Sequence, residues 1–394
     1  MANDFDRYRK VREEHGGRVD VESNVTGWIV VGVLLVITCG AWFFALPTYR
    51  SLLSGDLQAS LVRSSSASVT SSLPVNYQQS STSKKPSAQG KQVQRPQQPG
   101  FLLRERKPDE MAVVFFDVGQ GDAIFIKTPR GKNILVDCGE GKNPDYPMAR
   151  KVDAANTLLL PFFARNNIQK LHYYIASHPH SDHIGAAYDL LKKMPVKEVW
   201  IAGHDHPSTS KENMLKIIDK KGLTMKAPAK IGGDLKEGMK MDRLGPGVKG
   251  WLLRTAPKDE NTNNSSLVNL FYYGENSVLL TGDIEGTREG GGFGEQELVK
   301  MWGEQINVDV LKVSHHGSRF STTEEFLDFV KPKYAVIQVG HYNTFGHPTP
   351  ETLTRLREAE TEKIYRNDED GTVFMFMDGK NIRVKTRRDM SAVN

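Results

Sequence analysis

Residues 177–185 read SHPHSDHIG and continue an apolar segment, HYYIAS, that has the length and composition of a strand. Within six residues this stretch holds three imidazoles and one carboxylate, from His178, His180, Asp182 and His183. Neutral imidazoles and carboxylates are suitable ligands for zinc, manganese or iron. The alternative is a polar loop in which Asp182 caps the following helix, but capping does not need three histidines. The stretch therefore predicts a metal site at the end of a strand.

The segment 109–388 alternates short apolar runs with helix-like stretches. Runs such as AVVFFDV, NILVDCG, SVLLTGD and YAVIQVG have strand length and are rich in β-branched or aromatic residues. The helix-like stretches fall near 150–167, 184–193, 211–221, 295–302, 322–330 and 350–359. The early strands form hairpin-like pairs and the later ones alternate with helices, which favours an α/β fold with mixed sheets covered by helices. Most polar motifs stand where a strand ends, as sites do in open α/β folds.

Charge is unevenly distributed along the 394 residues. Residues 1–108 hold 14 Lys and Arg against 8 Asp and Glu, whereas residues 109–394 hold 38 against 39. The net charge of +5 therefore belongs to the N-terminal part, and the balance of the rest gives no support for the basic face of a nucleic-acid binder. The two cysteines, Cys39 and Cys138, exclude a disulfide framework and a thiolate metal site.

An uncharged apolar run, GWIVVGVLLVITCGAWFFAL at 27–46, has the length that a helix needs to cross a bilayer. A buried core helix and a cleaved signal peptide are the alternatives, but a signal core is shorter and ends in small residues rather than in bulky aromatics. Five basic residues precede the run and two follow closely, so the N-terminus is expected in the cytoplasm and the remainder outside it. We therefore predict a cytoplasmic tail at 1–24 and a single transmembrane anchor at 25–48 in the cell membrane.

The segment 49–108 is rich in Ser, Gln and Pro, as in QQSSTSKKPSAQGKQVQRPQQPG. Such a composition lacks the apolar surface that would offset the entropy lost on ordering. It predicts a disordered, flexible linker between the anchor and a hydrolase domain at 109–388.

Several motifs resemble those of the metallo-β-lactamase superfamily, and they occur in the family's order. The stretch from His178 to His183 resembles its metal-binding motif. Val136–Gly139, Leu280–Asp283 and Val313–Ser318 resemble its first motif, its bridging aspartate and its late histidine motif. More narrowly, three further stretches resemble the hydrolase domain of ComEC, the competence channel of DNA-importing bacteria; these are Phe116–Asp122, Asn263–Val268 and Gly346–Glu351. The resemblance covers roughly residues 110–380.

The resemblance implies a four-layer αββα sandwich that holds two divalent metal ions, zinc or manganese. His178 and His180 would hold one ion, Asp182, His183 and His316 would hold the second, and Asp283 would bridge them. Asp182, Asp283 and His347 would take part in catalysis, with His347 as a phosphate contact or a leaving-group acid. A pair of ions provides activated water for attack on a phosphorus or carbonyl centre.

Other residues are expected to support the metals or the substrate; they are His315, Asp117, Gln120, Asp122, Asp137 and Ser266. Asp137 would hold the metal loop, and the histidine of the pair 315–316 that is not a ligand would orient a ligand or the substrate. Asp122 could instead pair only with backbone amides. Many superfamily members carry another histidine before the bridging aspartate, where this chain has 263–266, so a water or a Ser or Asn oxygen would fill in.

Three functions are compatible with these motifs. A phosphodiesterase that cleaves DNA follows from the ComEC-like motifs, and a separate membrane channel is then an expected partner because this chain has one predicted span. A hydrolase of another extracytoplasmic ester, such as a phosphocholine or envelope phosphodiester or a lactone, would use the same metals. A non-catalytic, membrane-tethered binding module is the third, but a module of that kind would not need an intact set of metal ligands.

Overall fold

The computed structural model describes residues 103–142, 153–202, 207–227, 239–240, 244–254, 261–287 and 293–387. All of them lie in the second of two units into which the chain divides, residues 96–394. The strands of its first sheet are β1 (Met111–Phe115), β2 (Ile124–Lys127), β3 (Asn133–Val136), β4 (Leu171–Ala176), β5 (Val196–Ile201), β6 (Thr224–Lys226), β14 (Val373–Met377) and β15 (Ile382–Thr386). Those of its second sheet are β7 (Met239–Lys240), β8 (Val248–Arg254), β9 (Leu267–Tyr273), β10 (Asn276–Leu280), β11 (Val310–Lys312), β12 (Tyr334–Ile337) and β13 (Lys363–Arg366).

The helices connect these strands. They are η2 (Leu103–Glu105), η4 (Ala155–Leu159), α3 (Leu160–Arg165), α4 (Ser181–Ile184), α5 (Ala187–Lys193), α6 (Thr209–Lys221), η5 (Asn263–Ser265), α7 (Gly294–Trp302), η7 (Gly303–Ile306), η8 (Ser314–Gly317), α8 (Glu324–Val330), α9 (Pro350–Glu358) and α10 (Asn367–Asp370). Each helix-like stretch of the sequence contains one or two of them. Ordinary capping sets several starts: the hydroxyls of Ser208, Thr323 and Thr349 accept bonds from backbone amides of α6, α8 and α9.

The two sheets repeat one strand pattern. In the first sheet the order is β15-β14-β1-β2-β3-β4-β5-β6, and in the second it is β13-β12-β11-β10-β9-β8-β7. Strands β1 to β3 pair antiparallel, and β3 to β6 then pair parallel. Strands β8 to β10 likewise pair antiparallel, and β10 to β13 pair parallel. The expected change from hairpins to helix-linked strands thus occurs twice, once in each sheet.

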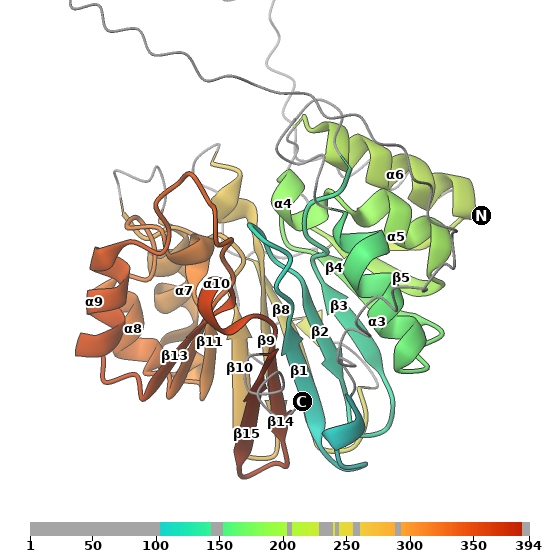
Figure 1. The fold of residues 1–394 in the computed structure, drawn as a ribbon. Coiled ribbons are helices and arrows are strands. Elements are labelled where there is room, and N and C mark those ends of the chain that lie inside the picture. Colours follow the sequence, from blue (N-terminus) through green and yellow to red (C-terminus); the bar gives the residue numbers. More distant parts are fainter. Residues whose placement is uncertain are drawn as a thin grey trace, which may run out of the picture. The chain divides into compact units, whose positions relative to one another are not determined.

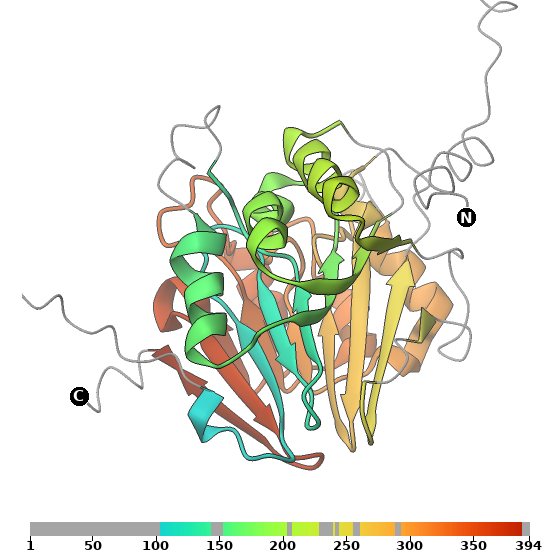
Figure 2. The same cartoon turned by 90° about the vertical axis from the view of Figure 1, so that its right-hand side faces the viewer.

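The inner faces of the two sheets pack against each other and form one core. This core joins side chains of the first sheet, such as Val113 and Ile175, with side chains of the second, such as Phe271 and Val310. A second core lies between the outer face of the second sheet and α7, α8 and α9, and it includes Trp302 and Phe326. Figure 1 shows these helices outside one sheet and α3 to α6 outside the other, and Figure 2 faces the latter group. The chain therefore forms a mixed α/β sandwich of helices, sheet, sheet and helices, as expected.

Burial on both sides explains the continuous apolar runs. All five residues of β1, MAVVF, are buried, as are those of β10 and β14. A sheet that is covered on both faces needs no alternation of polar and apolar side chains. On the outer side of the first sheet, Phe162 and Phe163 of α3 pack edge-on or tilted against Phe116 and Phe125, with ring centroids 4.9–5.8 Å apart.

The N-terminal predictions fall largely outside this description. The predicted tail at 1–24, the anchor at 25–48 and most of the linker at 49–108 lie outside the described residues. Among the residues that are described, no helix is long and apolar enough to cross a bilayer. Residues 103–108, which the sequence assigns to the linker, contact the folded unit, because the Leu103 amide donates to Asn166 Oδ1 at 2.6 Å. The structured part thus begins before residue 109.

Candidate metal centre

The predicted ligands, together with Asp137 as their predicted support, stand at the ends of four strands that meet at one edge of the two sheets. Asp137 follows β3, the segment 177–183 follows β4, Asp283 follows β10, and His316 follows β11. The two pairs of strands occupy equivalent places in the repeated pattern of the sheets. Two halves of the molecule, far apart in sequence, thereby face each other across the junction between the sheets.

The helix α4 presents two of these ligands. Its N-cap residue, His180, makes no capping bond with its side chain, and Asp182 lies in the first turn. Asp182 Oδ2 is 3.1 Å from His316 Nε2, so this carboxylate is directed at the opposite sheet. Asp182 is therefore not the N-cap of the helix, contrary to the alternative interpretation of the sequence.

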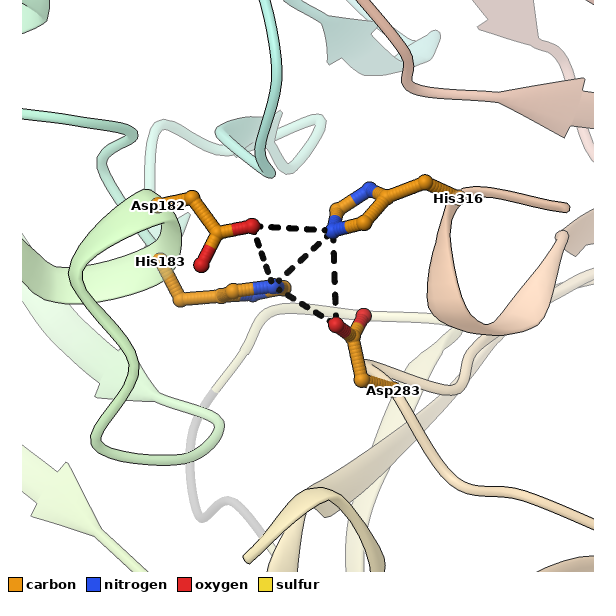
Figure 3. Close-up of side chains that lie close together, drawn as sticks. All are labelled: Asp182, His183, Asp283 and His316. Carbon is orange, nitrogen blue, oxygen red and sulfur yellow. Dashed lines mark hydrogen bonds and ion pairs between the residues drawn. The ribbon is translucent and has the colours of Figure 1, made fainter. Parts of the chain in front are cut away.

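Four side chains converge: Asp182, His183, Asp283 and His316 (Figure 3). His183 Nε2 is 3.1 Å from Asp283 Oδ2 and 3.3 Å from His316 Nε2. His316 Nε2 is 3.3 Å from Asp283 Oδ2. One ligand atom of each residue lies within 4.8 Å of those of the other three, which is the arrangement a single cation requires. We call these four residues the central cluster.

His178 and His180 extend this cluster on one side. His178 Nε2 lies 3.1 Å from His180 Nδ1 and 3.9 Å from Asp283 Oδ2. The Nδ1 atom of His178 lies 3.0 Å from Ser177 Oγ and 3.2 Å from Ser266 Oγ. All six predicted metal ligands are therefore brought together, with Asp283 between the two groups.

Asp137 orients the metal-binding stretch from behind. Its carboxylate accepts bonds from the Ser177 amide at 2.7 Å, the Ser177 hydroxyl at 2.6 Å and His183 Nδ1 at 2.9 Å. A carboxylate on Nδ1 fixes the imidazole so that Nε2 carries the lone pair, which is the usual arrangement around a metal-bound histidine. Asp137 adopts φ 54°, a conformation that non-glycine residues adopt at functional sites when surrounding contacts enforce it.

The two adjacent histidines of the SHHG stretch point in different directions. Both have left-handed backbones, with φ 48° for His315 and 54° for His316. His316 is buried, and its Nδ1 donates to the Gln338 carbonyl at 2.8 Å. His315 is partly exposed, and its Nδ1 lies 2.9 Å from Glu285 Oε1. The structure thus places His316 inside the central cluster and His315 beside it, which is the assignment that the sequence favoured.

A buried ion pair lies behind the cluster. Lys312 on β11 is fully buried, and its Nζ is 2.6 Å from Asp122 Oδ2 and 3.4 Å from Asp283 Oδ1. The same ammonium donates to the Gly282 carbonyl at 2.8 Å. Burial alone would lower the pKa of Lys312, but Asp122 and Asp283 raise it, so the side chain stays charged. Asp122 therefore pairs with a cation and not only with backbone amides.

The donor set of the central cluster fits a divalent cation. His183 and His316 both donate through Nδ1, so their Nε2 lone pairs face each other and two carboxylates. Such atoms repel one another unless positive charge lies between them. Burial alone would lower the pKa of both imidazoles, yet Asp283 and Asp182 raise that of His183 well above its ordinary value and that of His316 to about 10. Without a metal ion, the imidazoles of His183 and His316 would therefore both be protonated at neutral pH.

Two glycines permit the close approach of backbone that this geometry needs. A Cβ on Gly121, where φ is +122°, would lie 2.0 Å from the carbonyl oxygen of Asp182. A Cβ on Gly282, where φ is +57°, would lie 2.8 Å from Ser266 Oγ. Only glycine fits such positions at low cost, which explains its presence in the VGQGD and LTGD motifs.

Asp117, Gln120 and His347 stand around the rim. Asp117 accepts a bond from the Gly119 amide at 3.3 Å, and Gln120 Oε1 accepts one from the Gly340 amide at 3.2 Å. Both side chains thus bond to backbone amides of loops and not to members of the central cluster. The His347 ring centroid is 5.7 Å from that of His315. Burial, followed by His315 and His316, lowers the pKa of His347 to about 4, so this ring is neutral at neutral pH.

The residues of the stretch 263–266 contact different parts of the site. Asn263 Nδ2 donates to Glu285 Oε1 at 3.2 Å, and Asn264 Oδ1 accepts from the Glu285 amide at 2.8 Å. Ser266 instead adjoins His178, and its Oγ accepts from the Asp283 amide at 3.1 Å. Among the Ser and Asn oxygens of this stretch that were expected to replace the missing histidine, that of Ser266 is therefore the one that lies at the site.

Two residues of the site were missed by the sequence analysis, Lys312 and Glu285. A signal for Lys312 was present, because a lysine in the apolar strand DVLKV directly before the histidine motif has no solvent to face. Glu285 follows the bridging aspartate by two residues, but nothing local indicates that it meets His315. Outside the site, His172 Nδ1 accepts a bond from the Asn133 amide at 3.1 Å.

Comparisons with known proteins agree with this geometry. The family model of the metallo-beta-lactamase superfamily matches residues 116–341. The chain is 33% identical over 271 residues to ComE operon protein 3 of Bacillus subtilis (strain 168), which is 67% of this chain and 33% of that protein. It is 32% identical over 257 residues to Recombination protein 2 of Haemophilus influenzae, or 65% of this chain and 28% of that protein.

The chain spans about a third of the length of these curated relatives. Among solved structures, it is similar to Igni18, a metallo hydrolase from the archaeon Ignicoccus hospitalis KIN4/I. That likeness has a TM-score of 0.40 and 19% identity, and it covers 67% of this chain and 98% of the other.

Proposed function

This chain belongs to the metallo-beta-lactamase superfamily, and we propose that it is a membrane-anchored, two-metal phosphodiesterase that cleaves DNA. The observation that supports the proposal most directly is the convergence of the six predicted ligand side chains from three strand ends, those of β4, β10 and β11, with Asp283 placed between the two groups. Its ComEC-like motifs and its similarity to competence and recombination proteins favour nucleic acid as the substrate.

The ligands divide between two positions. His178 and His180, with Ser266 beside them, would hold one ion, and Asp182, His183 and His316 would hold the other, with Asp283 shared. When bound, two divalent ions would supply an activated water nucleophile and would stabilise charge on the phosphate oxygens. Carboxylate and imidazole donors suit zinc and manganese alike.

The residues behind the ligands keep this arrangement rigid. Asp137 holds His183 through Nδ1, and the Gln338 carbonyl holds His316. Lys312 offsets the charge of Asp122 and Asp283, and it contacts Asp283 through Oδ1, whereas Oδ2 faces His183 and His316. Preorganised ligands of this kind need no rearrangement during the reaction, which is a large part of what an active site contributes.

His347 is placed to contact a phosphate oxygen. Its ring lies beside His315 at the rim of the site, and its lowered pKa keeps it neutral at neutral pH. A neutral imidazole can donate a hydrogen bond through its one N–H group but holds no extra proton to release. We therefore propose that His347 acts as a phosphate contact and not as the acid for the leaving group.

The test is cleavage of labelled single- and double-stranded DNA by the full chain in detergent, with added Mn²⁺ or Zn²⁺ and with bis-p-nitrophenyl phosphate as a small diester. We expect metal-dependent cleavage of both substrates. His180→Ala and Asp283→Ala should abolish it, because each removes a proposed ligand of the ions that supply the nucleophile. His172→Ala, which changes a histidine away from the site, should leave it unchanged. Full activity of Asp283→Ala would overturn the site assignment. Cleavage of the small diester but not of DNA would still support a phosphodiesterase, and its substrate would then be sought among envelope esters.

The proposed location is the cell membrane, with the apolar segment 25–48 as a single anchor and the hydrolase domain outside the cytoplasm. The length of that segment and the basic residues before it support this topology. Removal of residues 25–48 should release the protein from the membrane fraction. Protease added to intact spheroplasts should degrade the hydrolase domain, and protection of that domain would contradict the topology. A separate channel protein is the expected partner, to be sought by crosslinking in membranes.

A further inference from the structure

Two aromatic side chains stand exposed in the loop between β12 and α9. Tyr342 is 85% exposed and Phe345 is 66% exposed. The other large hydrophobic side chains exposed in the described part of the chain are Tyr188 and Phe293, at 37% and 41%. Exposing two such rings within four residues costs solvation free energy, so a role in binding is the natural explanation.

The loop is held in one conformation by Asn343. Its Oδ1 accepts bonds from the amides of Phe345 and His347, at 3.2 and 3.1 Å. Its Nδ2 donates to the carbonyls of Gly340 and His347, at 2.9 and 2.8 Å. Because these bonds already order the backbone of the loop, little backbone entropy is lost when a ligand binds to the two rings.

A series of rings runs from this loop to the central cluster. The Phe345 ring stacks on His347, with centroids 5.9 Å apart and planes 21° apart. His347 lies 5.7 Å from His315, and His315 lies 6.2 Å from His316, a member of the cluster. A ligand that lies on Phe345 would therefore stand at the outer end of a row of rings that leads to the central cluster.

A cationic side chain reaches the surface from the adjoining loop. Arg319 is exposed and follows the cluster residue His316 by three positions. The two loops are joined where the Thr349 amide donates to the Gly317 carbonyl at 2.9 Å. The Arg319 guanidinium lies over the Phe320 ring, 4.7 Å from its centroid. Flat rings on one loop and a guanidinium on the loop joined to it match the two parts of a nucleotide, the base and the phosphate.

We propose that Tyr342 and Phe345 form a stacking surface for unpaired nucleobases, which makes single-stranded nucleic acid the preferred substrate at the metal centre. This inference rests on the proposed phosphodiesterase function and specifies its substrate. Bases in a duplex are stacked on one another and offer no free face to a protein ring, so a stacking surface distinguishes single strands from duplexes. Because every base has a flat face, the surface is expected to tolerate any sequence. Arg319 would contact the phosphate backbone.

The experiment measures binding without catalysis. The full chain in detergent, with EDTA, is titrated against a fluorescently labelled single-stranded 12-mer and a matching hairpin duplex, with anisotropy as the readout. Phe345→Leu and Tyr342→Leu keep an apolar side chain but remove the flat ring, and Tyr188→Leu is the matched control on α5. Hydrolysis of bis-p-nitrophenyl phosphate with metal is measured in parallel, and urea midpoints check folding.

We expect the double variant to bind the single strand at least about tenfold more weakly, from the usual contribution of a stacked ring, and the duplex less than twofold more weakly. Tyr188→Leu should match the wild type both in binding and in hydrolysis of the small diester. No measurable binding of the single strand by the wild type, unchanged binding by the double variant, or an equal loss for single strand and duplex would each overturn the stacking surface. Failure to hydrolyse any diester would instead contradict the proposed function, since the binding measurement requires no catalysis.

Discussion

At the scale of single residues, the sequence predicted the side chains that converge in the central cluster, but only some of the residues that contact them. His178, His180, Asp182 and His183 fall in one short motif, so their chemistry is visible without any knowledge of the fold. Asp137 was expected to support the metal loop, and the structure shows its carboxylate on His183. The pair of Lys312 with Asp122 depends on a contact between β11 and the loop after β1, which no local pattern of residues encodes.

The buried charge of Lys312 leads to a prediction about stability. Lys312→Met should leave the Asp122 carboxylate buried without its cation, and loss of one partner of a buried pair usually costs about 3–5 kcal/mol of unfolding free energy. Urea unfolding of the chain in EDTA measures this cost separately from metal binding. The double variant Lys312→Met with Asp122→Asn should be more stable than Lys312→Met alone, because both charges are gone. A single variant as stable as the wild type would contradict the role given to this pair.

Close backbone contact at Gly121 makes a second residue-scale prediction. Gly121→Ala should bring a methyl group into the Asp182 carbonyl and shift α4, which we expect to cost about 1–3 kcal/mol of unfolding free energy and to lower diester hydrolysis. Gly119→Ala is the matched control. Gly119 also has a positive φ, of +81°, but its Cβ would meet nothing within 4 Å. Equal effects of the two substitutions would show that backbone strain, and not the contact with Asp182, is responsible.

At the scale of elements, the positions of helices and strands followed from apolar periodicity and strand composition. The backbone turns between them did not. His315 and His316 adopt left-handed conformations at the end of β11, and this turn aims one ring inward and the other outward. Backbone propensity alone would not predict this conformation for two adjacent histidines. Tertiary contacts to Gln338 and Glu285 impose it.

The carboxyl group of Glu295 connects α7 with the start of α8, and its ionisation makes the unfolding free energy depend on pH. This fully buried carboxyl on α7 accepts bonds from the Thr323 amide at 2.9 Å and the Thr323 hydroxyl at 2.8 Å, at the start of α8. Burial, partly offset by the bonds from Thr323 and Thr322 and by the charge of Arg355, raises the pKa of Glu295 to about 7. A carboxyl with a raised pKa stabilises the folded state at low pH, and that contribution is lost as the pH rises through about 7.

The corresponding test compares the wild type with Glu295→Gln by urea unfolding between pH 5 and pH 8. The difference in unfolding free energy, wild type minus variant, should fall by roughly 2–3 kcal/mol over this range. Glu297→Gln, a partly exposed neighbour on α7, serves as the control and should show no such trend. A difference that stays constant with pH would show that Glu295 remains ionised in the folded protein.

At the scale of the whole molecule, the sandwich of two mixed sheets was expected and was found. Similarity to the superfamily and to ComEC-like competence proteins was likewise expected from the motifs and is confirmed. The sequence could not show that the two sheets repeat one strand pattern, because their side chains differ even where their strand order agrees. That repetition is what places Asp182 and His183 of one half opposite Asp283 and His316 of the other.

Because its ligands come from both sheets, a bound metal should stabilise the entire sandwich. At a free metal concentration of 100 times Kd, a single site adds about 2.7 kcal/mol to the unfolding free energy. The Tm of the wild type should therefore rise when Mn²⁺ or Zn²⁺ is added after EDTA treatment. Asp283→Ala should show little rise, and His172→Ala should behave as the wild type. A rise of equal size in Asp283→Ala would place the stabilising metal elsewhere.

The proposed function requires that the two halves of the sandwich together hold two metal ions for hydrolysis. Its most direct test is to strip the protein with chelator and to follow the hydrolysis of bis-p-nitrophenyl phosphate as Mn²⁺ or Zn²⁺ is returned, for the wild type and for Asp283→Ala. We expect no activity without metal, recovery that saturates at about two ions per chain, and none in the variant. Hydrolysis that persists in chelator, or that returns equally in Asp283→Ala, would contradict it.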